Sequence, residues 1–434
     1  MTNENTVKII GAGLAGCEAA WQLANRGIKV KLYEMKPKKM SPAHKTADFA
    51  ELVCSNSFRA DGIHNAVGVL KEEMRALGSL IMECADATRV PAGGALAVDR
   101  DGFSKMVTEK IQSHNNIEVI CEEVEEIDTN QYTIIAAGPL ASDKISQSIK
   151  KLTGGEGLHF FDAAAPIVSY DSIDMTKAFR AARYGKGGDD YINCPMTKDE
   201  YIAFRNALIT AEAAPVHDGV DNPKVFEGCM PIEIMAMRGE DTMRFGPLKP
   251  VGLTNPHDQT RPYAVVQLRQ DNGAASMFNI VGFQTHLKFG EQKRVFGMIP
   301  GLQNAEFVRY GVMHQNTYIN SPGILTSNYN MKEFPKIYFA GQITGVEGYI
   351  ESASSGMWAG ISLACHLNGN EVPQLSARTA MGALSQYVSN PAVTDFQPMN
   401  VNFGIFEDLG MRIKDKKEKA EKYAERALAE INAL

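Results

Sequence analysis

A glycine-rich segment near the start of the chain limits the possible folds more than any other feature. Residues 7–34 read VKIIGAGLAGCEAAWQLANRGIKVKLYE. A short apolar run leads into Gly11, Gly13 and Gly16 in the spacing G-x-G-x-x-G, and a helical pattern and a second strand-like run ending at Glu34 follow. This strand–loop–helix–strand order with a terminal acid predicts a Rossmann-like unit and therefore an α/β fold with a parallel sheet.

Each part of this unit has a physical task in holding a dinucleotide. Gly11 permits the tight turn, Gly13 lets the backbone approach a pyrophosphate, and Gly16 lets the helix and strand pack closely. The unpaired N–H groups of the helix start attract phosphate, and Glu34 can accept hydrogen bonds from ribose hydroxyls. We expect Cys17, inside the same helix start, to serve packing. The fingerprint alone does not distinguish NAD from FAD.

Two later segments favour FAD. Residues 133–139, TIIAAGP, read as a buried strand that ends in small residues including Gly138. Residues 337–360, IYFAGQITGVEGYIESASSGMWAG, read as another strand, a glycine-rich loop and a helix. An N-terminal fingerprint with a C-terminal A-G-x-x-x-G resembles the glutathione-reductase-type flavoproteins. That resemblance implies that four residues lie near the ribityl chain or flavin ring: Gly341, Gln342, Gly345 and Gly348.

The length of 434 residues predicts two domains, or one domain with a large insertion. If both ends of the chain build one domain, residues 1–160 and 325–434 form a discontinuous FAD-binding domain. Residues 161–324 then form an inserted α+β domain on the substrate side. Within it, residues 263–270 and 275–284 read as strands of a mostly antiparallel sheet, and residues 200–214 read as an amphipathic helix.

Charge and cysteine content exclude several classes of protein. The net charge of −7 argues against a globally basic nucleic-acid binder, so any RNA contact needs a local basic patch. No run of about 18 apolar residues occurs, and the start has no secretory pattern, so we expect no membrane span and a cytoplasmic protein. Seven scattered cysteines without a C-x-x-C pair argue against a disulfide framework and against a metal site.

Two of these cysteines have polar surroundings. Cys54 lies in ELVCSNSFRADG, with Arg59 close behind it, and Cys229 lies in FEGCMPIE, followed by Arg238 and Arg244. A neighbouring cation raises the thiolate fraction of a cysteine and therefore its reactivity. Both cysteines are therefore candidates for chemistry, although a buried structural role is the alternative for each.

At these residues the chain resembles the FAD- and folate-dependent tRNA (uracil-5-)-methyltransferases of bacteria. The resemblance covers essentially the whole chain. It rests on IIGAGLAGCEAAWQLANRG, FAELVCSNSFR, PAGGALAVDRDGFS, FEGCMPIE, RFGPLKPVGL, VGFQTHLKFGEQ and YFAGQITGVEGYIESASSGMWAG. A larger relative, the flavoprotein that modifies wobble uridines of tRNA, has extra C-terminal helical domains. This chain ends soon after the flavin motif, which favours the methyltransferase.

The resemblance implies a reaction and its partners. Methylenetetrahydrofolate donates the carbon, FAD reduced by NAD(P)H supplies the reducing equivalents, and a T-loop uridine of tRNA becomes 5-methyluridine. By the same resemblance, Cys229 is the nucleophile that adds to carbon 6 of the uracil. Cys54 lies beside the flavin as the base or as a group that protects the flavin, and the two roles could be exchanged.

Other interpretations stay open at this point. A plain NAD(P)H-dependent flavin oxidoreductase acting on a small molecule would need both nucleotide motifs but not the two thiols. A non-catalytic flavin-bound RNA-binding protein would tolerate loss of both. For tRNA docking we expect a patch of Lys177, Arg180, Arg183 and Lys186, together with the C-terminal helix. In that helix, we expect an apolar stripe of Ala420, Ala424, Ala427, Leu428, Ile431 and Leu434. The oligomeric state is not determined by the sequence.

Overall fold

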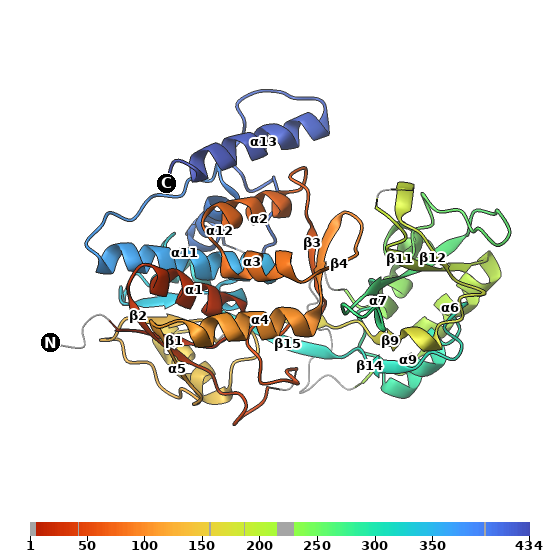
Figure 1. Ribbon diagram of the computed structural model, residues 1–434, viewed down its shortest axis with the longest axis horizontal. Coiled ribbons are helices and arrows are strands. Elements are labelled where there is room, and N and C mark those ends of the chain that lie inside the picture. Colours follow the sequence, from red (N-terminus) through yellow and green to blue (C-terminus); the bar gives the residue numbers. More distant parts are fainter. Residues whose placement is uncertain (1–5, 42, 156–157, 186, 215–229, 395) are drawn as a thin grey trace.

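Two large sheets organise the chain in the computed structural model, which describes residues 6–434 except 42, 156–157, 186, 215–229 and 395 (Figure 1). The first sheet is parallel, with the strand order β16-β7-β1-β2-β6. Its strands are β1 (Thr6–Ile10), β2 (Lys29–Tyr33), β6 (Ile117–Ile120), β7 (Thr133–Ile135) and β16 (Ile337–Phe339). Because β16 pairs with β7, the two ends of the chain share one sheet, as the sequence predicts.

Close contact between two helices joins these ends further. Helix α1 (Leu14–Asn25) packs against α11 (Tyr349–Leu367). A Cβ atom at Gly356 would overlap the Ala15 carbonyl oxygen, and one at Gly360 would lie 2.8 Å from the Ala19 oxygen. Glycine at these two positions therefore allows the helix backbones to touch, which fixes the C-terminal loop over the N-terminal fingerprint.

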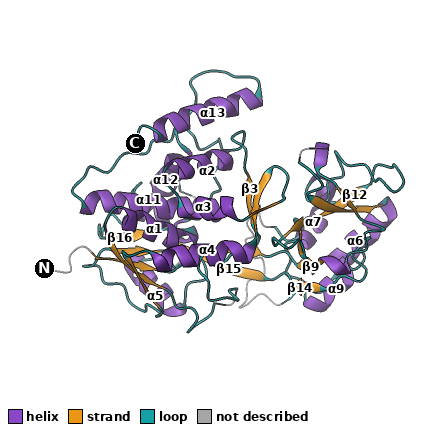
Figure 2. Cartoon of the chain, in the orientation of Figure 1, coloured by secondary structure: helices purple, strands orange, loops and turns teal. Residues whose placement is uncertain are grey.

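Further helices surround this core (Figure 2). They are α2 (Ala66–Ala76), α3 (Leu80–Ala87), α4 (Arg100–Ser113), α5 (Asp143–Thr153), α10 (Ser321–Ile324), α12 (Ala380–Ser389) and α13 (Lys416–Ile431), with a 3-10 turn at Gln342–Thr344. The expected stripe of α13 is wrong at its end, since Leu434 is 50% exposed. The helix stops at Ile431, so Leu434 leaves the buried face, while Tyr423 belongs to it.

The second large sheet has the order β10-β11-β12-β13-β9-β14, and all its strand pairs are antiparallel. Its strands are β9 (Ile167–Ser169), β10 (Phe179–Arg180), β11 (Tyr191–Met196), β12 (Ala264–Gln270), β13 (Met277–Ile280) and β14 (Phe307–Arg309). Helices α6 (Lys198–Thr210), α7 (Ile232–Arg238), α8 (Thr242–Phe245) and α9 (Phe289–Phe296) accompany it, with 3-10 turns at Tyr170–Ser172 and Arg183–Gly185. Helix α6 begins two residues before the predicted start because Thr197 and Glu200 form a capping box.

These two units confirm an α/β Rossmann-like domain that carries an inserted α+β unit. Each has its own core, the second around Phe278, Phe283 and Phe296. Between them lie the ladder of β8 (Leu158–Ala163) with β15 (Met313–Tyr318) and a small sheet of β3 (Ser57–Ala60), β5 (Ala95–Val98) and β4 (Arg89–Val90) (Figure 1). The domain boundaries at residues 160 and 325 stay a prediction.

Candidate active site

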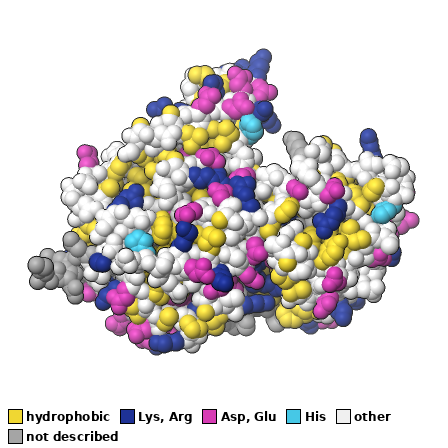
Figure 3. Space-filling model, in the orientation of Figure 1, with side chains coloured by type: hydrophobic (Ala, Val, Ile, Leu, Met, Phe, Trp, Pro, Cys, Tyr) yellow, Lys and Arg dark blue, Asp and Glu magenta, His cyan; other side chains and the backbone are white. Residues whose placement is uncertain are grey.

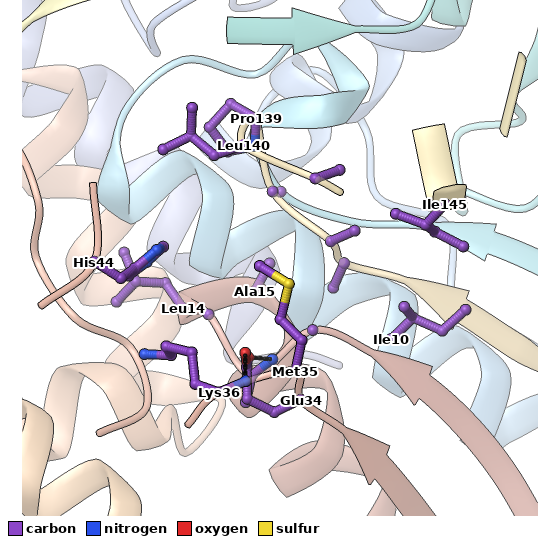
Figure 4. A pocket seen from close by; sticks show the side chains of 18 of the residues that line it. Ile10, Leu14, Ala15, Glu34, Met35, Lys36, His44, Pro139, Leu140 and Ile145 are labelled. Atoms are coloured by element: carbon purple, nitrogen blue, oxygen red, sulfur yellow. Dashed lines mark hydrogen bonds between the residues drawn. The ribbon is translucent and has the colours of Figure 1, made fainter. Parts of the chain in front are cut away.

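A deep pocket opens at the carboxyl ends of β1, β2 and β7, with an empty volume of about 1140 Å³ including its mouth (Figure 4). This edge of a parallel sheet is where Rossmann-like folds bind ligands. Many lining groups are apolar or backbone, and they come from both ends of the chain. Among the predicted cofactor residues, the pocket is lined by Gly11, Gly13, Glu34, Gly138, Gly341 and Gln342.

The first glycine loop has the geometry that its motif predicts. Gly11 has a φ of +102°, a conformation that residues with a side chain rarely adopt. A Cβ atom at Gly16 would overlap the Gly11 carbonyl oxygen, whereas nothing lies within 4 Å of such an atom at Gly13. Gly16 therefore serves packing and Gly13 leaves open space in the pocket. Helix α1 begins without a side-chain cap or an acidic residue in its first turn, which leaves its N-terminus suited to a phosphate.

Glu34 closes the base of this loop (Figure 4). Its Oε2 accepts a hydrogen bond from Ala12 N at 2.9 Å, and its Oε1 accepts one from Lys36 N at 3.0 Å. The carboxylate is 8% exposed and is held in one position beside the pocket. Each oxygen keeps a second lone pair, so the carboxylate has acceptor capacity left for ribose hydroxyls.

The C-terminal glycine loop reaches the pocket only in part. Gly341 and Gln342 line it, but Gly348 does not. Gly348 has a φ of +114° and precedes α11, where a side chain would collide with Glu351. Gly348 therefore shapes the turn into α11, and its prediction as a direct cofactor contact is not supported by the lining of the pocket.

Among the lining residues, Lys36 and His44 belong to none of the sequence motifs, whereas Glu51 and Tyr349 lie within two of them. Ser41 Oγ and His44 Nδ1 lie 2.5 Å apart, and burial, followed by the nearby Lys36, lowers the pKa of His44. These residues lie in or next to irregular segments, which have no periodic signal. The glycine loops, the open helix start and the anchored carboxylate together fit a long dinucleotide such as FAD.

Cys54 follows the pocket residue Val53 in the chain and is half-buried. Its backbone N donates to Tyr349 Oη at 2.8 Å, and Ser55 N donates to the same oxygen at 3.2 Å. Both Tyr349 and Val53 line the pocket. The thiol itself makes one long contact, from Sγ to the Ala163 oxygen at 3.6 Å. Burial, and then the Cys54 thiol, raises the pKa of Tyr349, so its hydroxyl stays protonated.

Residues of the inserted sheet hold the loop that carries Cys54. Arg269 of β12 donates from Nη2 to Ser55 Oγ at 2.7 Å and from Nε to Asn56 Oδ1 at 3.1 Å. Asn56 in turn donates to the Gln270 oxygen at 2.9 Å and to the Val98 oxygen at 2.8 Å. The two residues after Cys54 are therefore held by β12 of the inserted sheet, and Asn56 is held in addition by β5 of the small three-stranded sheet.

A buried ion pair completes this junction. Arg100 Nη2 lies 2.9 Å from Asp271 Oδ1, and its Nε lies 3.1 Å from Oδ2, while Nη1 donates to the Leu52 oxygen. Arg59, the cation nearest to Cys54 in sequence, is instead ion-paired with Glu351. Arg100 and Arg269 are distant in sequence from Cys54, so the sequence around Cys54 does not indicate this arrangement.

Cys229 lies outside the described residues, so its predicted role stays a prediction. The chain that follows it is anchored to residues 284–286. Ile232 N donates to the Gln284 oxygen at 2.7 Å, and Glu233 accepts from Thr285 Oγ1 at 2.9 Å. His286 Nδ1 lies 2.5 Å from Glu233 Oε1, and the histidine lies outside the strands of the inserted sheet.

The predicted tRNA patch is largely occupied by contacts within the protein. Arg183 Nε donates to Gln267 Oε1 at 2.9 Å, and Arg180 lies over the rings of Tyr170 and Phe278. Lys186 lies outside the described residues. Helix α13 packs on α2 in the other lobe (Figure 1). Figure 3 shows acidic and basic side chains mixed over the visible face rather than one basic surface.

Among the described residues no group of three or more His, Cys, Asp or Glu side chains could hold a metal ion. In the same part of the chain, no helix combines the length and apolarity that crossing a membrane requires.

Comparisons with known proteins identify the family of the chain. The family model described as "Glucose inhibited division protein A" matches residues 6–371. A relative from Acetivibrio thermocellus is 63% identical over 97% of each chain, and one from Streptococcus sanguinis is 59% identical over 98% of each. Both are named methylenetetrahydrofolate--tRNA-(uracil-5-)-methyltransferase TrmFO.

The fold also matches a solved structure, that of Aquifex aeolicus GidA, with a TM-score of 0.71 at 16% identity. The match covers 100% of this chain and 74% of that one, which shows a shared fold. Taken with the sequence relatives, it places the chain in the GidA family, among the methylenetetrahydrofolate--tRNA-(uracil-5-)-methyltransferases.

Proposed function

We propose that this protein methylates carbon 5 of a T-loop uridine in tRNA to give 5-methyluridine, with methylenetetrahydrofolate as carbon donor and FAD as cofactor. The observation that carries the proposal is the hydrogen bond from Cys54 N to the pocket residue Tyr349, on a loop that Arg269 also holds. The names of the close relatives supply the substrates.

The pocket residues divide the binding of FAD between them. The open start of α1 suits the pyrophosphate, Glu34 suits a ribose, and Gly341 and Gln342 lie toward the C-terminal loop. FAD, when bound and reduced, supplies the electrons that turn a methylene group into a methyl group. NAD(P)H as the reductant is part of this proposal.

The two thiols supply the uracil chemistry. Carbon 5 of uracil is a poor nucleophile until the Cys229 thiolate adds to carbon 6 and converts the ring to an enolate. After carbon 5 has accepted the one-carbon unit, Cys54 removes its proton, and expulsion of the Cys229 thiolate restores the double bond. The fixed backbone on both sides of Cys54 suits a base that must reach one atom.

Two properties of the protein follow from this proposal. A tRNA-modifying enzyme with no described membrane-spanning helix suits the cytoplasm. Its tRNA must bind a local basic surface, because the chain as a whole is acidic. We propose no oligomeric state.

The test is to incubate the purified protein with unmodified tRNA transcript, NAD(P)H and methylenetetrahydrofolate, and then to analyse the nucleosides. We expect folate-dependent 5-methyluridine, and we expect its rate to fall by about 100-fold or more in Cys54→Ala. That variant keeps its flavin absorbance and melting temperature, because only one long contact of the thiol is lost. Buried Cys194 in β11 offers a control, since Cys194→Ala lowers stability rather than methylation at a permissive temperature.

NAD(P)H oxidation without any modified uridine would replace the proposal with a plain flavin oxidoreductase. A different modified base would point to the wobble-uridine activity, and normal turnover by Cys54→Ala would remove Cys54 from the mechanism.

A further inference from the structure

A ladder of stacked aromatic rings leads from the core of the inserted unit to its surface. Phe307 and Tyr310 stack with ring centroids 5.2 Å apart and 6° between the planes, and Tyr310 and Phe289 stack at 4.7 Å and 19°. At the inner end, Phe307 meets the buried Phe296 at 6.4 Å. The outermost ring, Phe289, is 55% exposed. We call Phe289, Tyr310 and Phe307 the aromatic ladder.

The outer ring, Phe289, is exposed, whereas the two other rings of the ladder are half-buried. The other rings are held parallel by their packing, so the outer ring is presented in a fixed orientation at little further entropic cost. An exposed aromatic ring that is fixed in this way is a surface on which another flat ring can stack. The ladder lies on α9 and at the end of β14, along one edge of the inserted lobe (Figure 1).

The charges around the ladder favour an anionic partner. The stretch from Lys288 to Phe296 carries three cations, Lys288, Lys293 and Arg294, against the single acid Glu291, on a chain of net charge −7. Lys288 and Arg294 pair with Glu212 and Glu291, but Lys293 is exposed and forms no ion pair within the described residues. A stacking ring beside a solvated cation suits a nucleobase and its phosphate.

The position of the ladder relative to the nucleotide pocket supports the same partner. Phe289 directly follows residues 284–288. Two hydrogen bonds hold this segment, one from Ala214 N to the His286 oxygen and one from Ile232 N to the Gln284 oxygen. Tyr310 follows Arg309, whose Nη2 lies 3.4 Å from the Ala43 oxygen, next to the pocket residue His44. Arg309, next to Tyr310, therefore joins the ladder to the segment beside the nucleotide pocket.

We propose that Phe289, supported by Tyr310 and Phe307, is a stacking platform for an unstacked nucleobase of the RNA substrate. This inference rests on the proposed function, because it takes tRNA as the substrate. A target uridine must leave its stack before a thiol can reach carbon 6, and a base of the same loop that stacks on Phe289 would hold the opened loop in place.

The test compares Phe289→Ala, Phe289→Trp and the control Met298→Ala, which removes another exposed apolar side chain just after α9. Binding of unmodified tRNA is measured by fluorescence anisotropy, and KM is measured for tRNA and for methylenetetrahydrofolate. We expect Phe289→Ala to weaken tRNA binding and to raise the KM for tRNA about 10-fold. We expect Phe289→Trp to bind tRNA as tightly as the wild type or more tightly, and Met298→Ala to match the wild type. The KM for folate, the flavin absorbance and the melting temperature stay unchanged in all three.

The salt dependence of tRNA binding distinguishes a stacking contribution from an electrostatic one. The ratio of affinities between wild type and Phe289→Ala stays constant from about 50 to about 300 mM salt, whereas the effect of Lys293→Ala shrinks as salt rises. Wild-type affinity for tRNA in Phe289→Ala would overturn the inference. A raised KM for folate in this variant would overturn it too and would indicate a folate site, and a changed oligomeric mass would indicate a contact between copies instead. If the wild type binds tRNA through Phe289 but forms no 5-methyluridine, the proposed function fails and the platform stands.

Discussion

The nucleotide pocket and the junction around Cys54 hold their functional groups in different ways. In the pocket, Gly11, Gly16 and Glu34 belong to one unit of 28 residues, within which Gly16 packs against Gly11 and Glu34 accepts from Ala12 N. At the junction, Cys54 depends on Arg269, more than 200 residues away, for the hydrogen bonds of its neighbours. The glycine loop is a local motif, whereas the junction exists only when the inserted unit docks on the Rossmann-like unit.

Breaking the local motif gives the largest expected effect. In Gly16→Val, the new side chain collides with the Gly11 carbonyl oxygen, so α1 cannot pack on β1. We expect loss of flavin absorbance and of the cooperative thermal transition, measured on the purified protein. Gly13→Ala is the matched control and keeps the fold, because a Cβ atom there meets nothing within 4 Å. A folded, flavin-containing Gly16→Val protein would show that the loop tolerates more than its geometry suggests.

Removing the ion pair of the junction lowers the stability of the protein strongly, while the glycine loop keeps its structure. Asp271→Ala leaves the buried Arg100 guanidinium without its carboxylate, which costs about 3–5 kcal/mol. Urea unfolding of the holoprotein measures this loss. The double variant Arg100→Met with Asp271→Leu removes both charges and recovers most of it. A loss below about 1 kcal/mol in Asp271→Ala would mean that water enters the junction and solvates Arg100.

The smallest effect that we expect is a pH dependence of stability that arises within the Rossmann-like unit, from Glu73. Glu73 of α2 accepts hydrogen bonds from Ala380 N at 2.6 Å and Met381 N at 2.8 Å, at the start of α12. Burial raises the pKa of Glu73 from 4.5 to about 8. Between these values the folded protein binds more protons than the unfolded chain, so this group destabilises the fold progressively as pH rises from 4.5 to about 8.

Glu73→Gln removes that titration. We expect the melting temperature of the wild type to fall more steeply than that of the variant between about pH 5 and pH 8. Identical pH profiles for the two proteins would show that Glu73 keeps the same pKa when folded and unfolded. Glu72, which is exposed beside it on the same helix, provides the control Glu72→Gln, for which we expect a wild-type slope.

The sequence by itself determined the fold class, the glycine loops and the family. These features depend on residues close together in the chain, since the G-x-G-x-x-G spacing, the strand periodicity and Glu34 specify a βαβ unit locally. The sequence also favours one FAD-binding domain built from both ends of the chain, but the pairing of β16 with β7 is known only from the structure.

Only the tertiary structure decided which residues surround Cys54 and which aromatic rings meet. Arg59 is the nearest cation in sequence but pairs with Glu351, while Arg269 reaches Ser55 and Asn56 from the inserted sheet. Phe289 and Tyr310 are ordinary aromatic residues in the sequence and become a stack only when α9 meets the end of β14. Such contacts depend on the packing of separate elements, which carries no periodic signal along the chain.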